Sequence, residues 1–207
     1  MAAGAPGPVI PSRYVEALDG ADPIVSQRKA PKRVKKLIRG LSEKVLARRP
    51  APGKWSIKEV IAHLADGEVI LGSRVRFVAA QDRPPLPGYD QDAFVERLAI
   101  DKERTCDLLD AFAAVRAVNV RLLERLPKDA FARVGLHAER GEESIEAMVA
   151  MYAGHDRIHE QQIEKIKGQL AERKRAKRAK RANDGKSAKK AKEPKASGSK
   201  KRAKVRT

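Results

Sequence analysis

The chain has 207 residues, enough for one domain of ordinary size, and a formal net charge of +18. Most of this charge lies at one end: residues 171–207 contain 17 lysines and arginines against 3 acidic residues, while residues 1–170 have a net charge of only +4. A single cysteine excludes an intrachain disulfide and a cysteine-rich metal site, and no apolar stretch approaches the roughly 18 residues of a membrane span. We therefore expect a soluble, cytoplasmic protein without a transmembrane segment or secretory leader.

The N-terminal 55 residues are the least regular part of the chain. We expect residues 1–10 to be flexible, and the apolar spacing predicts helical pieces near residues 13–19 and 31–39. Gly40 should end the second piece, and a short turn should follow near residues 42–47.

The clearest helix start is Ser56-Ile-Lys-Glu59, a capping box in which the serine and glutamate side chains each bind a backbone amide at the helix end. Apolar residues then recur at helical spacing until the prolines that begin at Pro84. The pattern predicts a long helix over residues 56–82.

The next helix should begin at Asp90 or Asp92, either of which is a suitable N-cap, and continue to Leu126 just before Pro127. It would be the longest element of the protein. Cys106 lies inside it beside two leucines, so we expect the thiol to be packed rather than reactive. Residues 127–143 carry two glycines and few periodic apolar residues, which indicates a connecting loop.

A last helix is predicted to start near Ser144. Its buried stripe includes two histidines together with apolar residues; the stripe consists of Ile145, Met148, Met151, Tyr152, His155, Ile158, His159, Gln162, Ile163 and Ile166. No segment shows the alternation typical of strands. Four principal helices predict an all-α protein, an antiparallel four-helix bundle over residues 11–170.

His155 and His159 are four residues apart, so a helix places both imidazoles on one face, as metal-chelating helices do. His63, on the helix predicted from residue 56, is available as a third ligand. The alternative is that each histidine is an ordinary hydrogen-bonded core residue. Three imidazoles buried without partners would each cost about 1–3 kcal/mol, and a shared cation removes that cost.

Imidazole ligands suit zinc, nickel, copper or iron(II), and the sequence does not choose among them. Three ligands leave a coordination position open for water or a small-molecule substrate, as in catalytic zinc sites. Asp66 and Asp156 are candidates for carboxylates that orient a ligand histidine, with solvated surface carboxylates as the alternative. The remaining histidine, His137, lies in the predicted loop, where we expect a cap or surface residue.

Three segments resemble the DinB-like superfamily: Arg49 to Asp66, Gly135 to Gly141, and Tyr152 to Ile163. Asp22 with Pro23, and the run from Leu86 to Asp92, also match, so that the resemblance covers roughly residues 11–170. It implies a four-helix bundle that holds a divalent metal (zinc, nickel or iron) through one histidine of the second helix and two of the last. These positions correspond to His63, His155 and His159.

The activity that the resemblance implies is less specific than the fold. Some members resemble thiol-dependent transferases or isomerases, and others are described as metal-dependent hydrolases. A metal-bound thiol is deprotonated and nucleophilic at neutral pH, so a low-molecular-weight thiol is one expected partner. Nothing in the sequence identifies the electrophile, and the oligomeric state stays open, a homodimer included.

Residues 171–207 contain almost nothing to bury and should be disordered. Their charge suits salt-sensitive, sequence-independent contact with nucleic acid, most densely through Lys174, Arg175, Lys177, Arg178, Lys180 and Arg181. The alternatives are a solubilising extension and an anionic membrane surface. In a competing functional hypothesis, the protein is non-catalytic, the metal is structural, and this tail carries the function.

Overall fold

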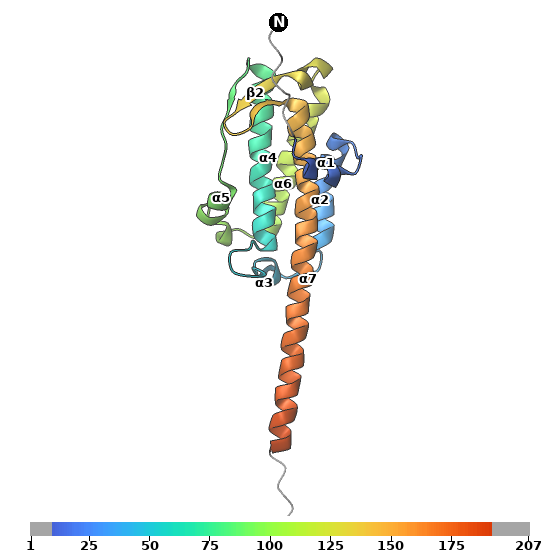
Figure 1. The fold of residues 1–207 in the computed structure, drawn as a ribbon, viewed down its shortest axis with the longest axis vertical. Helices are drawn as coiled ribbons and strands as arrows, with labels where there is room; N and C mark the ends of the chain where they lie inside the picture. The colour runs from blue at the N-terminus through green and yellow to red at the C-terminus, as the bar shows by residue number, and fades with distance from the viewer. Residues whose placement is uncertain (1–9, 192–207) are drawn as a thin grey trace, which may run out of the picture. The chain divides into compact units, whose positions relative to one another are not determined.

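The structure, a computed structural model, describes the backbone of residues 10–191 and the side chains of residues 10–180. The chain divides near Gly168 into a bundle and a C-terminal unit. The bundle is built from α2 (Pro23–Ile38), α4 (Ile57–Ala80), α6 (Thr105–Arg125) and the first part of α7 (Ile145–Ala191) (Figure 1). This confirms the predicted four-helix bundle. None of the helices described is long and apolar enough to cross a membrane.

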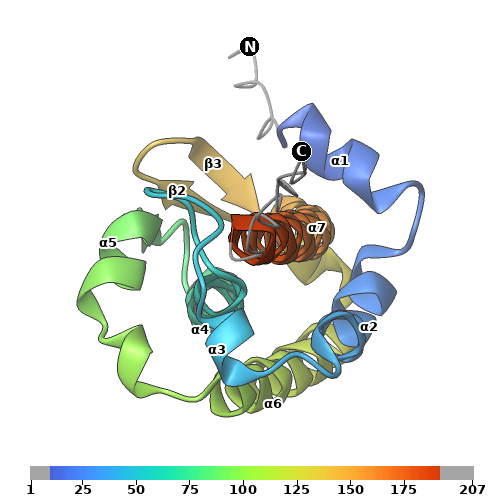
Figure 2. The ribbon, with the colours of Figure 1, turned by 90° about the horizontal axis from the view of Figure 1, so that it is seen from below.

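The four helices do not follow each other around the bundle in chain order. Viewed along their axes, the order is α2, α6, α4, α7 (Figure 2). Polar contacts give the directions. Glu68 of α4 contacts Arg116 of α6, and Arg76, further along α4, contacts Asn119, further along α6, so this pair is parallel. The pair of α2 and α7 is parallel as well. The other two neighbouring pairs are antiparallel. Long connections before α6 and α7 permit this order, whereas a simple up-and-down bundle has antiparallel neighbours throughout.

Local sequence explains where the main helices begin. At α4 both hydrogen bonds of the capping box form, with the Glu59 amide donating to Ser56 Oγ and the Ser56 amide donating to Glu59 Oε2. Asp22 caps α2, and Pro23 occupies its first turn. The apolar core between the helices includes Leu71, Val75, Val78, Leu122, Leu123, Ile145 and Met148. Of the predicted N-terminal pieces, the first corresponds to the short helix α1 (Ser12–Leu18), and the second is the C-terminal half of α2, which begins earlier than predicted. The predicted turn near residues 42–47 contains one short helix, α3 (Glu43–Leu46).

The predicted helix from Asp90 to Leu126 is wrong as a single element. It is divided into α5 (Gln91–Arg97), a 3-10 turn (Ile100–Lys102) and α6, with Ala99 in the left-handed region at φ 53°. The buried ammonium group of Lys58 binds the backbone carbonyls of Asp101 and Glu103 at the break. These contacts come from a distant helix, so apolar periodicity alone does not reveal them.

The predicted loop at residues 127–143 is also wrong, because it contains a 3-10 turn (Lys128–Ala132) and two strands. β2 (Val134–His137) pairs antiparallel with β3 (Gly141–Ser144) and parallel with the two-residue β1 (Pro85–Leu86). A Cβ at Gly135 would lie 2.7 Å from the Leu86 side chain, so the glycine permits close packing of the strands on the bundle. Strands of two to four residues are too short to give a periodic signal.

In the C-terminal unit, α7 continues as a helix through Ala191, where the sequence analysis expected disorder. Alanine, lysine and arginine are all strong helix formers, so this segment can continue the helix although it has almost nothing to bury. The remainder of the predicted tail, residues 192–207, and most of the predicted flexible N-terminus, residues 1–9, lie outside the described residues.

Candidate metal centre

Three histidines from two helices meet between α4 and α7. Nε2 of His155 lies 3.0 Å from Nε2 of His63 and 3.0 Å from Nε2 of His159. The three ligand atoms all lie within 4.8 Å of one another. His63 is 2% exposed, and the two histidines of α7 are half-buried. The structure thus brings together the three residues that the sequence singled out.

Hydrogen bonding among the imidazoles cannot satisfy this arrangement. Nε2 of a neutral imidazole carries either one hydrogen or one lone pair in the ring plane, whereas Nε2 of His155 faces two other nitrogens. Burial lowers the pKa of all three histidines, and proximity to other histidines adds to the lowering for His63, whose pKa falls to about 3, and for His155. The imidazoles are therefore neutral at pH 7, the form that binds metals.

Gln162 fixes the orientation of one of the three imidazoles, that of His159. Nδ1 of His159 lies 2.7 Å from Gln162 Oε1, an oxygen that can only accept, so Nδ1 carries the proton and Nε2 presents its lone pair to the cluster. Outer hydrogen bonds of this kind commonly orient metal-bound histidines. Sequence reasoning placed Gln162 on the buried stripe but missed this role, although its position three residues after His159 puts both side chains on the same face.

Aromatic residues form the walls around the cluster. The Trp55 ring lies 5.0 Å from His63 and stacks on His159 at 6.4 Å between centroids, while its Nε1 donates to Asp92. Tyr14 of α1 lies beside His155. Its backbone carbonyl packs so closely on Gly154 that a Cβ there would lie 2.1 Å from the oxygen. Gly154 is therefore what lets α1 lie against α7 next to the histidines.

A pocket of 370 Å³ opens on the cluster, and its lining includes Trp55, His155, His159 and Gln162. Two ligands on a metal at about 2.0–2.1 Å are separated by roughly 3.0–3.4 Å, depending on geometry, which matches the observed 3.0 Å contacts. Three neutral nitrogen donors beside a pocket fit a divalent metal of the zinc, nickel or iron(II) type with a further position open.

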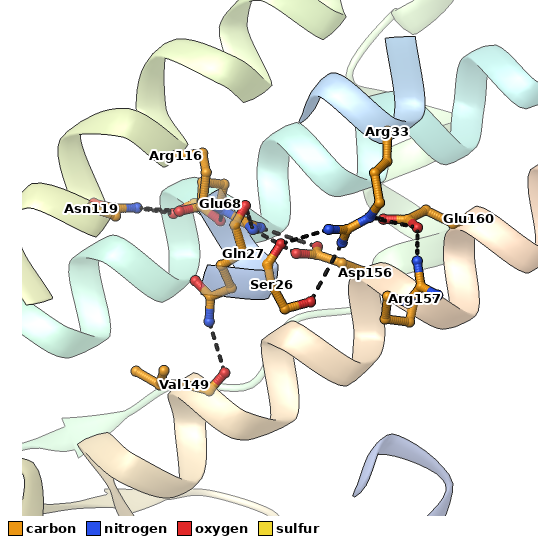
Figure 3. Close-up of polar contacts among 10 residues, drawn as sticks. All are labelled: Ser26, Gln27, Arg33, Glu68, Arg116, Asn119, Val149, Asp156, Arg157 and Glu160. Atoms are coloured by element: carbon orange, nitrogen blue, oxygen red, sulfur yellow. Dashed lines mark hydrogen bonds and ion pairs between the residues drawn. The ribbon is translucent and has the colours of Figure 1, made fainter. Parts of the chain in front are cut away.

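Asp156 does not orient a ligand histidine. Both of its carboxylate oxygens accept from the guanidinium of Arg116, at 2.5 and 3.1 Å, and Arg116 also donates to Glu68 at 2.6 Å. Figure 3 shows this network, which Asn119 and Gln27 complete. The reason is helical geometry, because the residue after His155 points about 100° away from it.

The other residues that the sequence analysis considered make no hydrogen bond to the three histidines among the described residues. Asp66 is half-buried on α4, and burial raises its pKa, but among the described residues it makes no hydrogen bond to the three histidines. His137 is 3% exposed, so the expectation of a surface residue is wrong; it ends β2 and contacts Arg74. Cys106 is exposed rather than packed, because α6 begins only one residue before it.

The basic residues of the predicted nucleic-acid contact lie along the C-terminal part of α7. Lys174, Arg175, Lys177, Arg178 and Lys180 are exposed, and Arg181 continues the helix.

Comparison with known proteins identifies the family of this chain. A sequence model of the DinB superfamily matches residues 28–163, a stretch that contains all three histidines. The chain belongs to the DinB superfamily. One relative, from Oceanobacillus iheyensis, is 23% identical over 130 residues, which cover 61% of this chain and 73% of that protein. Another, from Bacillus cereus, is 24% identical over 144 residues, 68% and 80% of the two chains. Each is named a "putative metal-dependent hydrolase".

A solved structure shares the fold of this DinB superfamily member. YfiT from Bacillus subtilis, described as "a probable metal-dependent hydrolase with an unusual four-helix bundle topology", superposes with a TM-score of 0.68 at 17% sequence identity. The match covers 82% of this chain and 94% of YfiT.

Proposed function

We propose that the protein is a metal-dependent hydrolase that binds one divalent metal ion through His63, His155 and His159. The observation that carries the proposal is the convergence of three Nε2 atoms whose contacts cannot all be hydrogen bonds. When bound, such an ion supplies Lewis acidity and lowers the pKa of its water to about 7. The names of the relatives from Oceanobacillus and Bacillus support the same class.

The surrounding residues have separate roles in this proposal. Gln162 holds the His159 ring so that its Nε2 faces the other ligands. Trp55 covers the rings of His63 and His159 and limits the access of water from that side. The pocket of 370 Å³ provides the approach for a substrate.

Metal analysis tests the binding site. Protein purified without a nickel column should contain about one divalent metal ion per chain by mass spectrometry, and alanine at His63, His155 or His159 should remove most of it. His137→Gln is the matched control, because it removes a buried imidazole that is not one of the three and should leave the stoichiometry at one. Full occupancy in the triple alanine variant would contradict the site.

Activity measurements test the reaction class. Nitrophenyl esters and nitroanilides should be hydrolysed by the metal-loaded protein, and activity should disappear on chelation and return with zinc, nickel or iron(II). If turnover occurs only when a low-molecular-weight thiol is added, the reaction is thiol transfer instead. If azide and thiols leave the spectrum of the cobalt-substituted protein unchanged, the coordination sphere is closed and the metal is structural.

A further inference from the structure

A second pocket, of 340 Å³, also has His155 in its lining. It shares Arg13, Tyr14, Gln91 and His155 with the pocket already described, so a molecule in it lies next to the candidate metal centre. Its lining includes three guanidinium groups, from Arg13, Arg74 and Arg140, against one carboxylate, from Glu139. The pocket is therefore positively charged.

Arg74 is the unusual member of this set. It is only 4% exposed, yet no carboxylate of the described residues lies within ion-pair distance of it. Its Nη2 donates to the carbonyl oxygen of Pro87 at 2.5 Å, and its buried Nε has no hydrogen-bond partner among the described residues. A buried cation without a counter-charge is costly, and native proteins rarely leave one without a reason.

The imidazole beside Arg74 does not compensate for the missing anion. Nε2 of His137 lies 3.2 Å from Nη2 of Arg74, but Nδ1 of the same ring accepts from the Glu139 amide. A neutral imidazole that accepts at Nδ1 carries its proton on Nε2, so it presents a hydrogen toward the guanidinium.

The other buried arginine among the described residues, Arg116, and the exposed Arg140 are both matched by carboxylates. Arg116 binds two carboxylates, and Arg140, which lines the same pocket as Arg74, is paired with Glu143 at its edge. Arg13 has no ion pair among the described residues either, but it is exposed to solvent, so Arg74 is the buried guanidinium that lacks a counter-charge.

We infer that this pocket binds the carboxylate of a small acidic substrate, with Arg74 as its main partner, while the rest of the substrate extends past His155 toward the metal. The inference rests on the proposed function, because it names the substrate class of that centre. Charge-assisted, bidentate binding of a carboxylate is the recognition for which a guanidinium is best suited.

The first test uses the cobalt-loaded full-length protein and thiols that bind the metal at one end. Mercaptoalkanoates of two, three and four carbons are titrated against the corresponding amides, and the thiolate-to-cobalt absorption band reports binding. At least one acid should bind roughly 10- to 100-fold more tightly than its amide. In Arg74→Met this preference should disappear while amide affinity is unchanged, and Arg74→Lys should keep part of it.

Arg140→Met is the control, since it removes the same charge from the same pocket but from a guanidinium already paired with Glu143. It should retain most of the preference. Equal affinity of acids and amides at all three lengths in the wild-type protein would overturn the inference, and so would equal losses in the two methionine variants, which would indicate a diffuse field rather than a built site.

A second test does not depend on the metal. Succinate should raise the unfolding temperature of the metal-free wild-type protein more than succinamide does, at ionic strength held constant with sodium chloride, and the difference should vanish in Arg74→Met. If cobalt does not bind or no thiol shifts its spectrum, the proposed function fails and this measurement alone decides on the anion site. Equal effects of succinate and succinamide would then reject it.

Discussion

Two pairs of polar residues on α7 are both directed into the bundle but have different surroundings. His155 and His159 form one pair, and Asp156 and Glu160 form the other, displaced by one residue and so by about 100° around the helix. The carboxylates are matched by Arg116 and Arg33. The imidazoles instead meet His63 with nitrogens that the protein does not satisfy, beside a pocket. Buried polar groups on α7 therefore indicate a candidate site only where their pairing within the protein is incomplete.

The largest effect on stability should come from removing Arg116, the cation that pairs with Glu68 and Asp156. Arg116→Met leaves Glu68 and Asp156 buried without their cation and should lower the free energy of unfolding by about 3–5 kcal/mol, measured by urea denaturation. Adding Glu68→Gln and Asp156→Asn should recover much of this loss. A cost below about 1 kcal/mol for the single change would contradict the view of the cluster as a structural unit.

A smaller effect is expected from a residue that orients one of the three histidines. Gln162→Leu removes the acceptor that orients His159 and should weaken zinc binding about 10- to 100-fold, measured by competition with a chelating dye. Unfolding of the metal-free protein should change little, because no charge is left unpaired. Gln161→Leu, one residue away on the same helix, is the matched control and should leave zinc affinity unchanged.

The histidine cluster should also make the stability of the protein depend on pH. The folded-state pKa of His63 is depressed to about 3, below the ordinary value of about 6.5, so between these values the unfolded chain binds a proton that the folded chain does not. The metal-free protein should therefore lose stability as pH falls below about 6.5, by up to about 1.4 kcal/mol per pH unit from this residue. Urea denaturation at pH 7, 6 and 5 measures the slope. His63→Gln should reduce it, and an unchanged slope would contradict the assignment.

The smallest effect on the bundle should come from the C-terminal unit. Ending the chain after Leu170 should leave the thermal stability of the bundle nearly unchanged, because the basic residues beyond it are exposed. Affinity for duplex DNA should fall sharply, and in the full-length protein its logarithm should decrease linearly with log salt, by about 0.9 per phosphate neutralised.

A matched variant separates charge from helix length in that experiment. Glutamine at Lys174, Arg175, Lys177, Arg178, Lys180 and Arg181 keeps the chain intact and should weaken DNA binding in the same direction as truncation. Undiminished binding by the truncated protein would move the nucleic-acid contact onto the bundle.

Sequence alone predicted what depends on local pattern. The capping box at Ser56, the bundle and the common face of His155 and His159 all follow from residues a few positions apart. The Arg116 network was not predictable in this way, because Glu68 lies 48 positions away and each residue by itself is typical of a polar helix face. The left-handed Ala99 and the two-residue strand β1 likewise depend on tertiary contacts that no short window contains.

The close contact between Tyr14 and Gly154 affects the walls of both pockets beside the histidines. It holds α1 where Arg13 and Tyr14 border both pockets, yet α1 precedes the stretch of residues 28–163 that matches the DinB superfamily. The three histidines thus lie inside the stretch that matches the family model, whereas the part of the pocket wall that α1 supplies lies outside it. Replacing the seven residues of α1 would change the lining of both pockets without altering any of the three histidines.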